Sequence, residues 1–203
     1  NALDVEDPLV AIDIAHSKGA YIIWNHPGWP DNKSTFYDVH GELIKAGKID
    51  AYEVYNYTES YPLTFDWYAQ YGIAPMANTD IHGTTAIDYG CDKGWMRPMT
   101  LVFATERTEA ALREALEAKR TLAFFQGNLV GDKEYLSKLV GASLKTRTVG
   151  DRLEVTNVSD ITYRMARGDA LYVFPAGKTV LIKTPQGELS VLNCLWGNGK
   201  YLT

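Results

Sequence analysis

Brief apolar runs alternate with stretches of helical periodicity from the start of the chain to about residue 139. The runs are short and rich in β-prone residues, which predicts buried strands over residues 20–24, 51–56, 74–78, 99–104 and 121–125. Helical spacing of apolar residues predicts helices over 8–18, 34–46, 63–71, 108–119 and 132–139. Helices and strands in alternation predict a parallel sheet with right-handed crossovers. We therefore expect residues 1–139 to form an α/β domain that is part of a barrel.

The pattern changes from about residue 140 onward. Residues 144–149 and 152–156 alternate like the two strands of a hairpin around a Gly150-Asp151 turn. Further strand candidates, separated by Pro/Gly turns, span residues 170–174, 178–183 and 188–192. Residues 140–203 are therefore predicted to form a small all-β, sandwich-like domain docked on the first.

Composition places the chain among soluble globular proteins. It has 203 residues, 46% of them hydrophobic, and a net charge of −5. The charge offers no broad basic field for nucleic acid, and no apolar run approaches the roughly 20 residues of a membrane span. The compartment stays open: cytoplasmic, or periplasmic if an upstream segment carries a signal peptide.

Polar side chains follow three of the predicted strands. His26 comes after the first, where Pro27 predicts extended backbone. Glu53 interrupts the second, apolar strand, and a carboxylate there is costly unless it is paired or faces a metal. Asp80 and His82 follow the third; two residues apart on an extended segment, their side chains point to the same side. A turn-capping role for His26 and an exposed edge position for Glu53 are the alternatives.

Carboxyl ends of parallel strands meet at one sheet edge, so these groups should converge. Imidazole and carboxylate together are what a hydrolytic divalent-metal site requires. Asn56 belongs to the same cluster. Lys93 and Arg97, shortly after the third motif, could meet an anionic substrate group, although solvated charges are equally expected. His16 and His40 lie within predicted helices and are assigned structural roles.

At these residues the sequence resembles the PHP (polymerase and histidinol phosphatase) family of metal-dependent phosphoesterases, over roughly residues 1–105. The matching stretches are Trp24-Asn25-His26-Pro27-Gly28, Asp50-Ala51-Tyr52-Glu53-Val54-Tyr55-Asn56 and Asn78-Thr79-Asp80-Ile81-His82-Gly83. The segment 97–125 and the β domain are similar to a two-domain bacterial subgroup of predicted phosphoesterases.

The resemblance implies a distorted (β/α)7 barrel with up to three divalent ions (Zn, Mn or Fe) at the strand ends. It implies that His26, Asp80 and His82 are the metal ligands and the catalytic centre. It also implies that Glu53 and Asn56 line the substrate pocket.

The chain departs from the family pattern in what it lacks. An initial His-x-His strand, a Thr-Asp-His motif and a further ligating Glu are absent from the sequence. We expect the chain to be the C-terminal part of a longer enzyme, since it starts at Asn1 without Met and in what looks like mid-barrel; a degenerate or separately encoded piece is the alternative. Alone it is predicted to be poorly active, with a missing N-terminal segment or an oligomer partner completing it.

The expected reaction is hydrolysis of a small-molecule phosphoric monoester or diester by a metal-bound hydroxide. Two other functions stay open. One is an amidohydrolase-like enzyme acting on a carbonyl centre with the same ligand types. The other is a non-catalytic binding module built on a remnant barrel.

Overall fold

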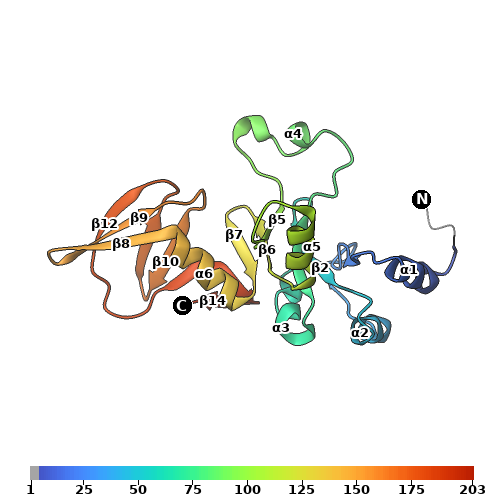
Figure 1. Cartoon of the computed structure of the whole chain (residues 1–203). Helices are drawn as coiled ribbons and strands as arrows, with labels where there is room; N and C mark the ends of the chain where they lie inside the picture. Colours follow the sequence, from blue (N-terminus) through green and yellow to red (C-terminus); the bar gives the residue numbers. More distant parts are fainter. Residues whose placement is uncertain (1–4) are drawn as a thin grey trace.

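A computed structural model describes residues 5–203 of the chain, which is a mixed α/β protein (Figure 1). The helices are α1 (Pro8–Ser17), α2 (Asp38–Lys45), α3 (Trp67–Tyr71), α4 (Thr85–Asp88), α5 (Glu109–Glu117) and α6 (Lys133–Ser143), with 3-10 turns η1 (Pro62–Thr64) and η2 (Cys91–Lys93). The first strands are β1 (Ile23–Trp24), β2 (Ala51–Asn56), β3 (Glu59–Ser60), β4 (Ala74–Asn78), β5 (Met99–Val102), β6 (Thr121–Phe125) and β7 (Asn128–Gly131). The others are β8 (Leu144–Val149), β9 (Arg152–Asn157), β10 (Tyr163–Arg167), β11 (Ala170–Phe174), β12 (Thr179–Lys183), β13 (Ser190–Gly197) and β14 (Lys200–Leu202).

The first sheet is organised around β2, whose six residues are all buried. Parallel β4 pairs along one edge of β2, while parallel β1 and the short antiparallel β3 pair with successive parts of its other edge. β1, β2 and β4 therefore place their carboxyl ends at the same edge of the sheet, as the βα pattern predicted.

The free edge of β4 is covered by two threonine side chains rather than by another strand. The Thr100 hydroxyl accepts a hydrogen bond from the Ala77 N–H (2.9 Å) and donates one to the Ala77 carbonyl (3.1 Å). The Thr121 hydroxyl donates to the Pro75 carbonyl (2.9 Å). Backbone groups buried without partners are costly, so these threonines satisfy the edge of β4 and join it to β5 and β6.

β5, β6 and β7 belong to a second sheet of seven strands, in the order β11-β10-β13-β7-β6-β5, with β14 also paired to β13. The pairs β5–β6 and β6–β7 are antiparallel. The prediction of five parallel βα units was therefore wrong for its last two strands. β6 runs antiparallel to β5 although α5 lies between them. Gln126 and Gly127, which have left-handed backbones, then make a tight turn that returns the chain as β7, a strand that the pattern did not predict.

Strands from both sides of residue 139 share this second sheet, because β7 pairs in parallel with β13. The predicted hairpin is confirmed as β8 and β9, which form a third sheet with β12. β10 and β14 were not predicted. In Figure 1 β8, β9 and β12 lie at the opposite end of the molecule from α1. The division into domains at 139/140 stays a prediction, and α6 runs across that position.

Two main apolar cores follow from this arrangement. One lies between the first sheet and the ends of β6 and β7, around Tyr52, Trp67 and Phe125. The other lies under α6 and is built by the C-terminal strands together with β6 and β7, with Leu136 and Phe174 among its buried residues. No helix within residues 5–203 has both the length and the apolar character that crossing a bilayer requires.

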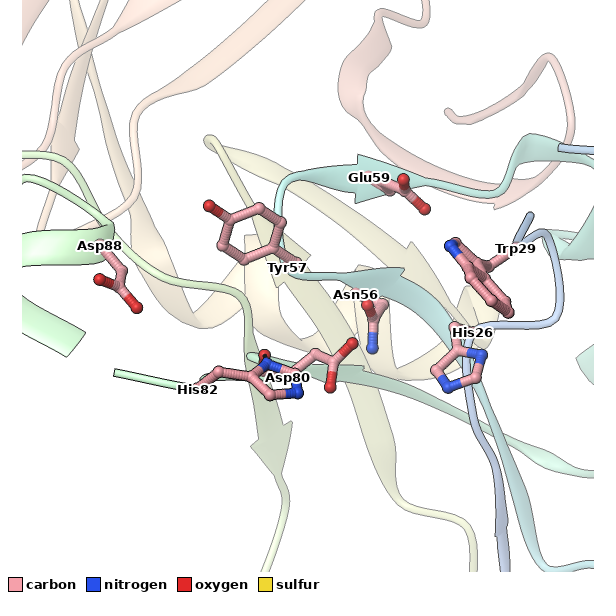
Figure 2. A pocket seen from close by; sticks show the side chains of 8 residues that line it. All are labelled: His26, Trp29, Asn56, Tyr57, Glu59, Asp80, His82 and Asp88. Atoms are coloured by element: carbon pink, nitrogen blue, oxygen red, sulfur yellow. Dashed lines mark hydrogen bonds between the residues drawn. The ribbon is translucent and has the colours of Figure 1, made fainter. Parts of the chain in front are cut away.

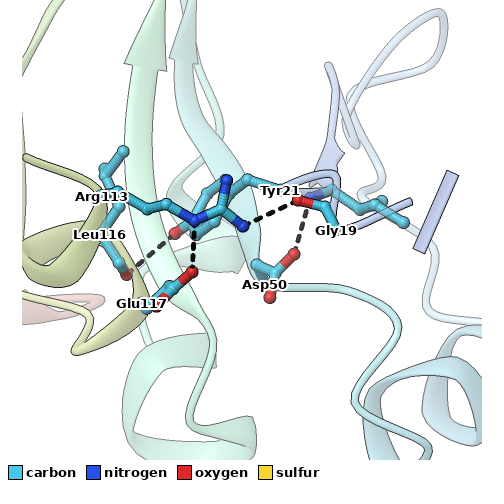
Figure 3. Close-up of polar contacts among 7 residues, drawn as sticks. Gly19, Tyr21, Asp50, Arg113, Leu116 and Glu117 are labelled. Carbon is cyan, nitrogen blue, oxygen red and sulfur yellow. Dashed lines mark hydrogen bonds and ion pairs between the residues drawn. The ribbon is translucent and has the colours of Figure 1, made fainter. Parts of the chain in front are cut away.

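Polar contacts fix the segment that leads into β1 (Figure 3). The Arg113 guanidinium of α5 donates to the Gly19 carbonyl (2.8 Å), and the Tyr21 hydroxyl donates to the Leu116 carbonyl (3.3 Å). The Ile22 N–H donates to the Asp50 carboxylate (2.6 Å). These bonds hold the segment that enters β1 against α5 and against the residue before β2.

Candidate functional site

A pocket of about 520 Å³ opens at the carboxyl ends of β1, β2 and β4 (Figure 2). Its lining residues are His26, Trp29, Asn56, Tyr57, Glu59, Asp80, His82 and Asp88. The three residues predicted as metal ligands thus come together in one pocket, from loops after two different strands. In Figure 2 the Asp80 carboxylate is drawn between the rings of His82 and His26.

The chain turns sharply after each of these strands. His26, Tyr57 and Asp80 have φ angles of 31°, 54° and 45°, in the left-handed region that non-glycine residues rarely occupy. The extended backbone predicted for His26 and Asp80 was therefore wrong. Such conformations cost on the order of 1–3 kcal/mol and persist where surrounding contacts impose them, which is common at functional sites.

Buried Glu53 supplies the contacts that impose the His26 turn. One carboxyl oxygen accepts hydrogen bonds from the His26 backbone N–H and from the Asn56 amide (2.9 Å). The other oxygen accepts one from the Asn78 amide (2.9 Å). With 2% of its surface exposed, Glu53 lies behind the pocket and not in its lining. It ties the ends of β1, β2 and β4 together.

Gly28 allows the loop after His26 to close on the protein. A Cβ placed on Gly28 would collide with the Tyr61 ring. The Tyr61 hydroxyl in turn donates to the Glu59 carboxylate (2.7 Å), which lines the pocket. Burial, and next this hydrogen bond, raise the pKa of Tyr61 above its usual value. The glycine of the His-Pro-Gly motif is thus explained by close packing.

His82 is oriented by its own backbone. Its Nδ1 lies 2.7 Å from the Asp80 carbonyl oxygen. Because a carbonyl can only accept, Nδ1 carries the proton and the neutral ring keeps Nε2 as its free lone pair. A histidine whose second nitrogen donates to a carbonyl is the usual arrangement of a metal ligand.

The charge of the pocket is unusual for a phosphate site. Three carboxylates, Asp80, Asp88 and Glu59, face two histidines, and the pocket as described over residues 5–203 has no Lys or Arg in its lining. Lys93 and Arg97 are exposed on the loop between α4 and β5 and lie outside the lining. A phosphate anion would therefore be repelled unless cations accompany it.

The donor types fit a divalent ion, but the set is open. Within the described part of the chain, no three His, Cys, Asp or Glu side chains lie close enough together to hold one ion. His26, Asp80 and His82 share the pocket without forming a closed cluster.

Two acidic lining residues were not singled out from the sequence. Glu59 lies on β3, a strand of two residues that the apolar pattern could not reveal. Asp88 lies near Gly83, which leaves room for its carboxylate: a Cβ there would sit 3.1 Å from an Asp88 oxygen. Gly83, which ends the third motif, was the sequence feature that could have indicated the close approach of Asp88.

Comparison with solved structures gives a neighbour of the same fold. It is a two-domain protein from Bacteroides vulgatus that contains a predicted PHP-like metal-dependent phosphoesterase. The two share 27% sequence identity with a TM-score of 0.90, over 100% of this chain and 66% of the neighbour. No protein-family model and no curated protein matches the sequence. The resemblance to PHP phosphoesterases drawn from the three motifs is confirmed by this structural neighbour.

Proposed function

We propose that this chain forms part of a metal-dependent hydrolase that cleaves a small phosphoric monoester or diester. The observation that carries the proposal is the pocket at the ends of β1, β2 and β4. There two histidines and Asp80 converge without any Lys or Arg in the described lining. The neighbour at 27% identity, which contains a predicted PHP-like metal-dependent phosphoesterase, supports the same class.

The finer architecture belongs to the proposal as well. Three parallel strands with a curled edge at β4 support reading residues 1–139 as part of a (β/α)7-type barrel. Residues 140–203 would then be the small β domain of a two-domain protein. The shared seven-stranded sheet makes the junction between them a hydrogen-bonded one.

Each polar residue has a proposed task. His26, Asp80 and His82 are the metal ligands, and bound divalent ions would activate water and neutralise the phosphate oxygens. The Asp80 carbonyl keeps the Nε2 lone pair of His82 available. Asn56 uses its amide nitrogen on Glu53, which leaves its amide oxygen to orient a water or a substrate hydroxyl. Glu53 positions the His26 backbone.

Lys93 and Arg97 stay predicted substrate contacts; reaching the pocket would require their loop to move.

Three ligands are too few for a centre with two or three ions. We propose that residues outside positions 5–203, from the same polypeptide or a partner, complete the coordination. The partner in the reaction is a small phosphoester rather than nucleic acid, in keeping with the net charge of −5.

Hydrolysis assays on the protein as the cell makes it test this function. p-Nitrophenyl phosphate, bis-p-nitrophenyl phosphate and p-nitrophenyl acetate are assayed with and without Mn²⁺ after chelation. We expect Mn²⁺ to restore cleavage of a phosphoester, and Asp80→Ala to abolish it, while Asp92→Ala, an exposed carboxylate outside the pocket, leaves it unchanged.

Other outcomes separate the rival functions. Cleavage of the acetate ester alone, with the same metal and Asp80 dependence, would replace the phosphoesterase by a hydrolase of carbonyl centres. Absence of any metal-dependent cleavage would contradict both hydrolase functions and favour the non-catalytic binding module.

A further inference from the structure

A second cavity, of about 450 Å³, lies beside the candidate metal pocket and has a different character. Its buried side is formed by the rings of Tyr89, Phe124 and Phe125, which are 4%, 7% and 5% exposed. Its other side is formed by Trp95 and Met96, which are 70% and 55% exposed. Exposed large apolar side chains beside a cavity are typical of a ligand-binding surface.

The two cavities are neighbours. Asp88 lines both of them. The ring of Tyr57, in the metal pocket, lies 5.8 Å from the ring of Tyr89, in the second cavity. In Figure 1 the segment with α4 and the turns after it projects away from the strands. The residues that line the second cavity come mainly from this segment and from β6 with the turn after it. This adjacency is what a substrate needs if it is to hold its reacting group in the first pocket and another part of the molecule in the second.

Charge and polarity restrict which substrate group the second cavity can bind. Asp88 is the one carboxylate among the described residues that line the second cavity, and no Lys or Arg accompanies it there. Burial raises the pKa of Tyr89 to about 12, and its hydroxyl donates to the Thr79 carbonyl (2.6 Å), so it is a neutral, occupied group. A second phosphate would meet an uncompensated carboxylate there, whereas the face of an uncharged ring would be covered by aromatic side chains.

We propose that the second cavity binds an uncharged aromatic group of one or two rings, carried by the phosphoester that the first pocket cleaves. This assignment rests on the proposed phosphoesterase function and names its substrate class. Trp95 is the specificity-determining residue, because it is an exposed aromatic face that a bound ring can cover.

Binding measurements separate this inference from the proposed function. The probes are methylphosphonate, (1-naphthylmethyl)phosphonate and neutral 1-naphthol, each titrated by calorimetry with Mn²⁺ present. We expect the naphthyl phosphonate to bind at least about tenfold more tightly than methylphosphonate. Trp95→Ala should remove most of that preference and lower the affinity for 1-naphthol, while the affinity for methylphosphonate stays the same. Ile87→Ala is the control, since Ile87 is 79% exposed on α4 and lines neither cavity.

Two results would overturn the inference in different ways. Equal affinity for the two phosphonates, both lost in Asp80→Asn, would reject the aromatic site and keep the phosphoesterase. Trp95-dependent binding of 1-naphthol with no binding of either phosphonate would reject the phosphoesterase and, with it, the substrate class.

Discussion

Single residues at the pocket are held by contacts that the sequence pattern only partly indicates. Glu53 was singled out because a carboxylate in an apolar strand needs a partner, and it has three N–H donors. His26 and Asp80 are held in left-handed turns instead of the extended backbone that we predicted. The residue type therefore pointed to the site, but the backbone that aims each side chain depended on contacts distant in sequence.

Replacing Glu53 should destabilise the protein. Glu53→Ala leaves three donors without an acceptor, the buried Asn56 amide and the partly buried groups of His26 and Asn78, so we expect the free energy of unfolding to fall by roughly 2–5 kcal/mol. Glu53→Gln should lower the free energy of unfolding by less, because its amide oxygen can still accept hydrogen bonds. Urea titration measures both, with exposed Glu42→Gln on α2 as the control. A loss for Glu53→Ala no larger than that of the control would contradict the role assigned to Glu53.

His40 gives stability a pH dependence. Its ring lies 3.8 Å from the Trp24 ring, and its Nδ1 accepts the Tyr37 N–H (3.2 Å), which requires an unprotonated nitrogen. Burial lowers the pKa of His40 below its usual 6.5. The unfolded chain therefore binds the proton at higher pH, so this contribution is present above about pH 6.5 and is lost as pH falls through the folded pKa.

The pH effect is measured by difference. Between about pH 8 and about pH 5, the wild-type free energy of unfolding should fall more than that of His40→Asn. His16→Asn, an exposed histidine on α1, should behave like the wild type. Equal falls for the wild type and His40→Asn would show that His40 is not the group responsible.

Among the elements, β4 depends on side chains for its free edge. Thr100→Val removes the hydroxyl that both accepts from and donates to the backbone of Ala77, a residue 3% exposed. We expect a loss of about 2–4 kcal/mol in the free energy of unfolding. Thr100→Ser keeps the hydroxyl and should lose clearly less, so similar losses in urea titrations of the two variants would argue against this contact.

The elements were predictable wherever the signal is local. β2 and β4 have the predicted bounds, and the Gly150-Asp151 turn joins β8 to β9 as expected. β1 is shorter than its apolar run, and β10 was missed. The Gln126-Gly127 turn was a local signal that we did not use, and it leads into β7, a strand that we did not predict.

For the whole molecule, pairing between distant strands decides the architecture. No pattern along the chain indicates that β7 pairs with β13, more than 60 residues later, to build one sheet across the predicted domain boundary. Convergence of the three motifs was predictable, because it follows from parallel strands alone. The adjoining apolar cavity was not, since Trp95 and Phe124 come from segments that the sequence does not connect.

Manganese binding tests the central claim, a metal site in the pocket of His26, Asp80 and His82, most directly. Calorimetric titration with Mn²⁺ should show saturable binding that Asp80→Asn and His82→Ala each weaken by at least about tenfold. Asp92→Asn, on the same surface segment but outside the pocket, should bind as the wild type does. Equal Mn²⁺ affinity in the wild type, Asp80→Asn and His82→Ala would contradict the account.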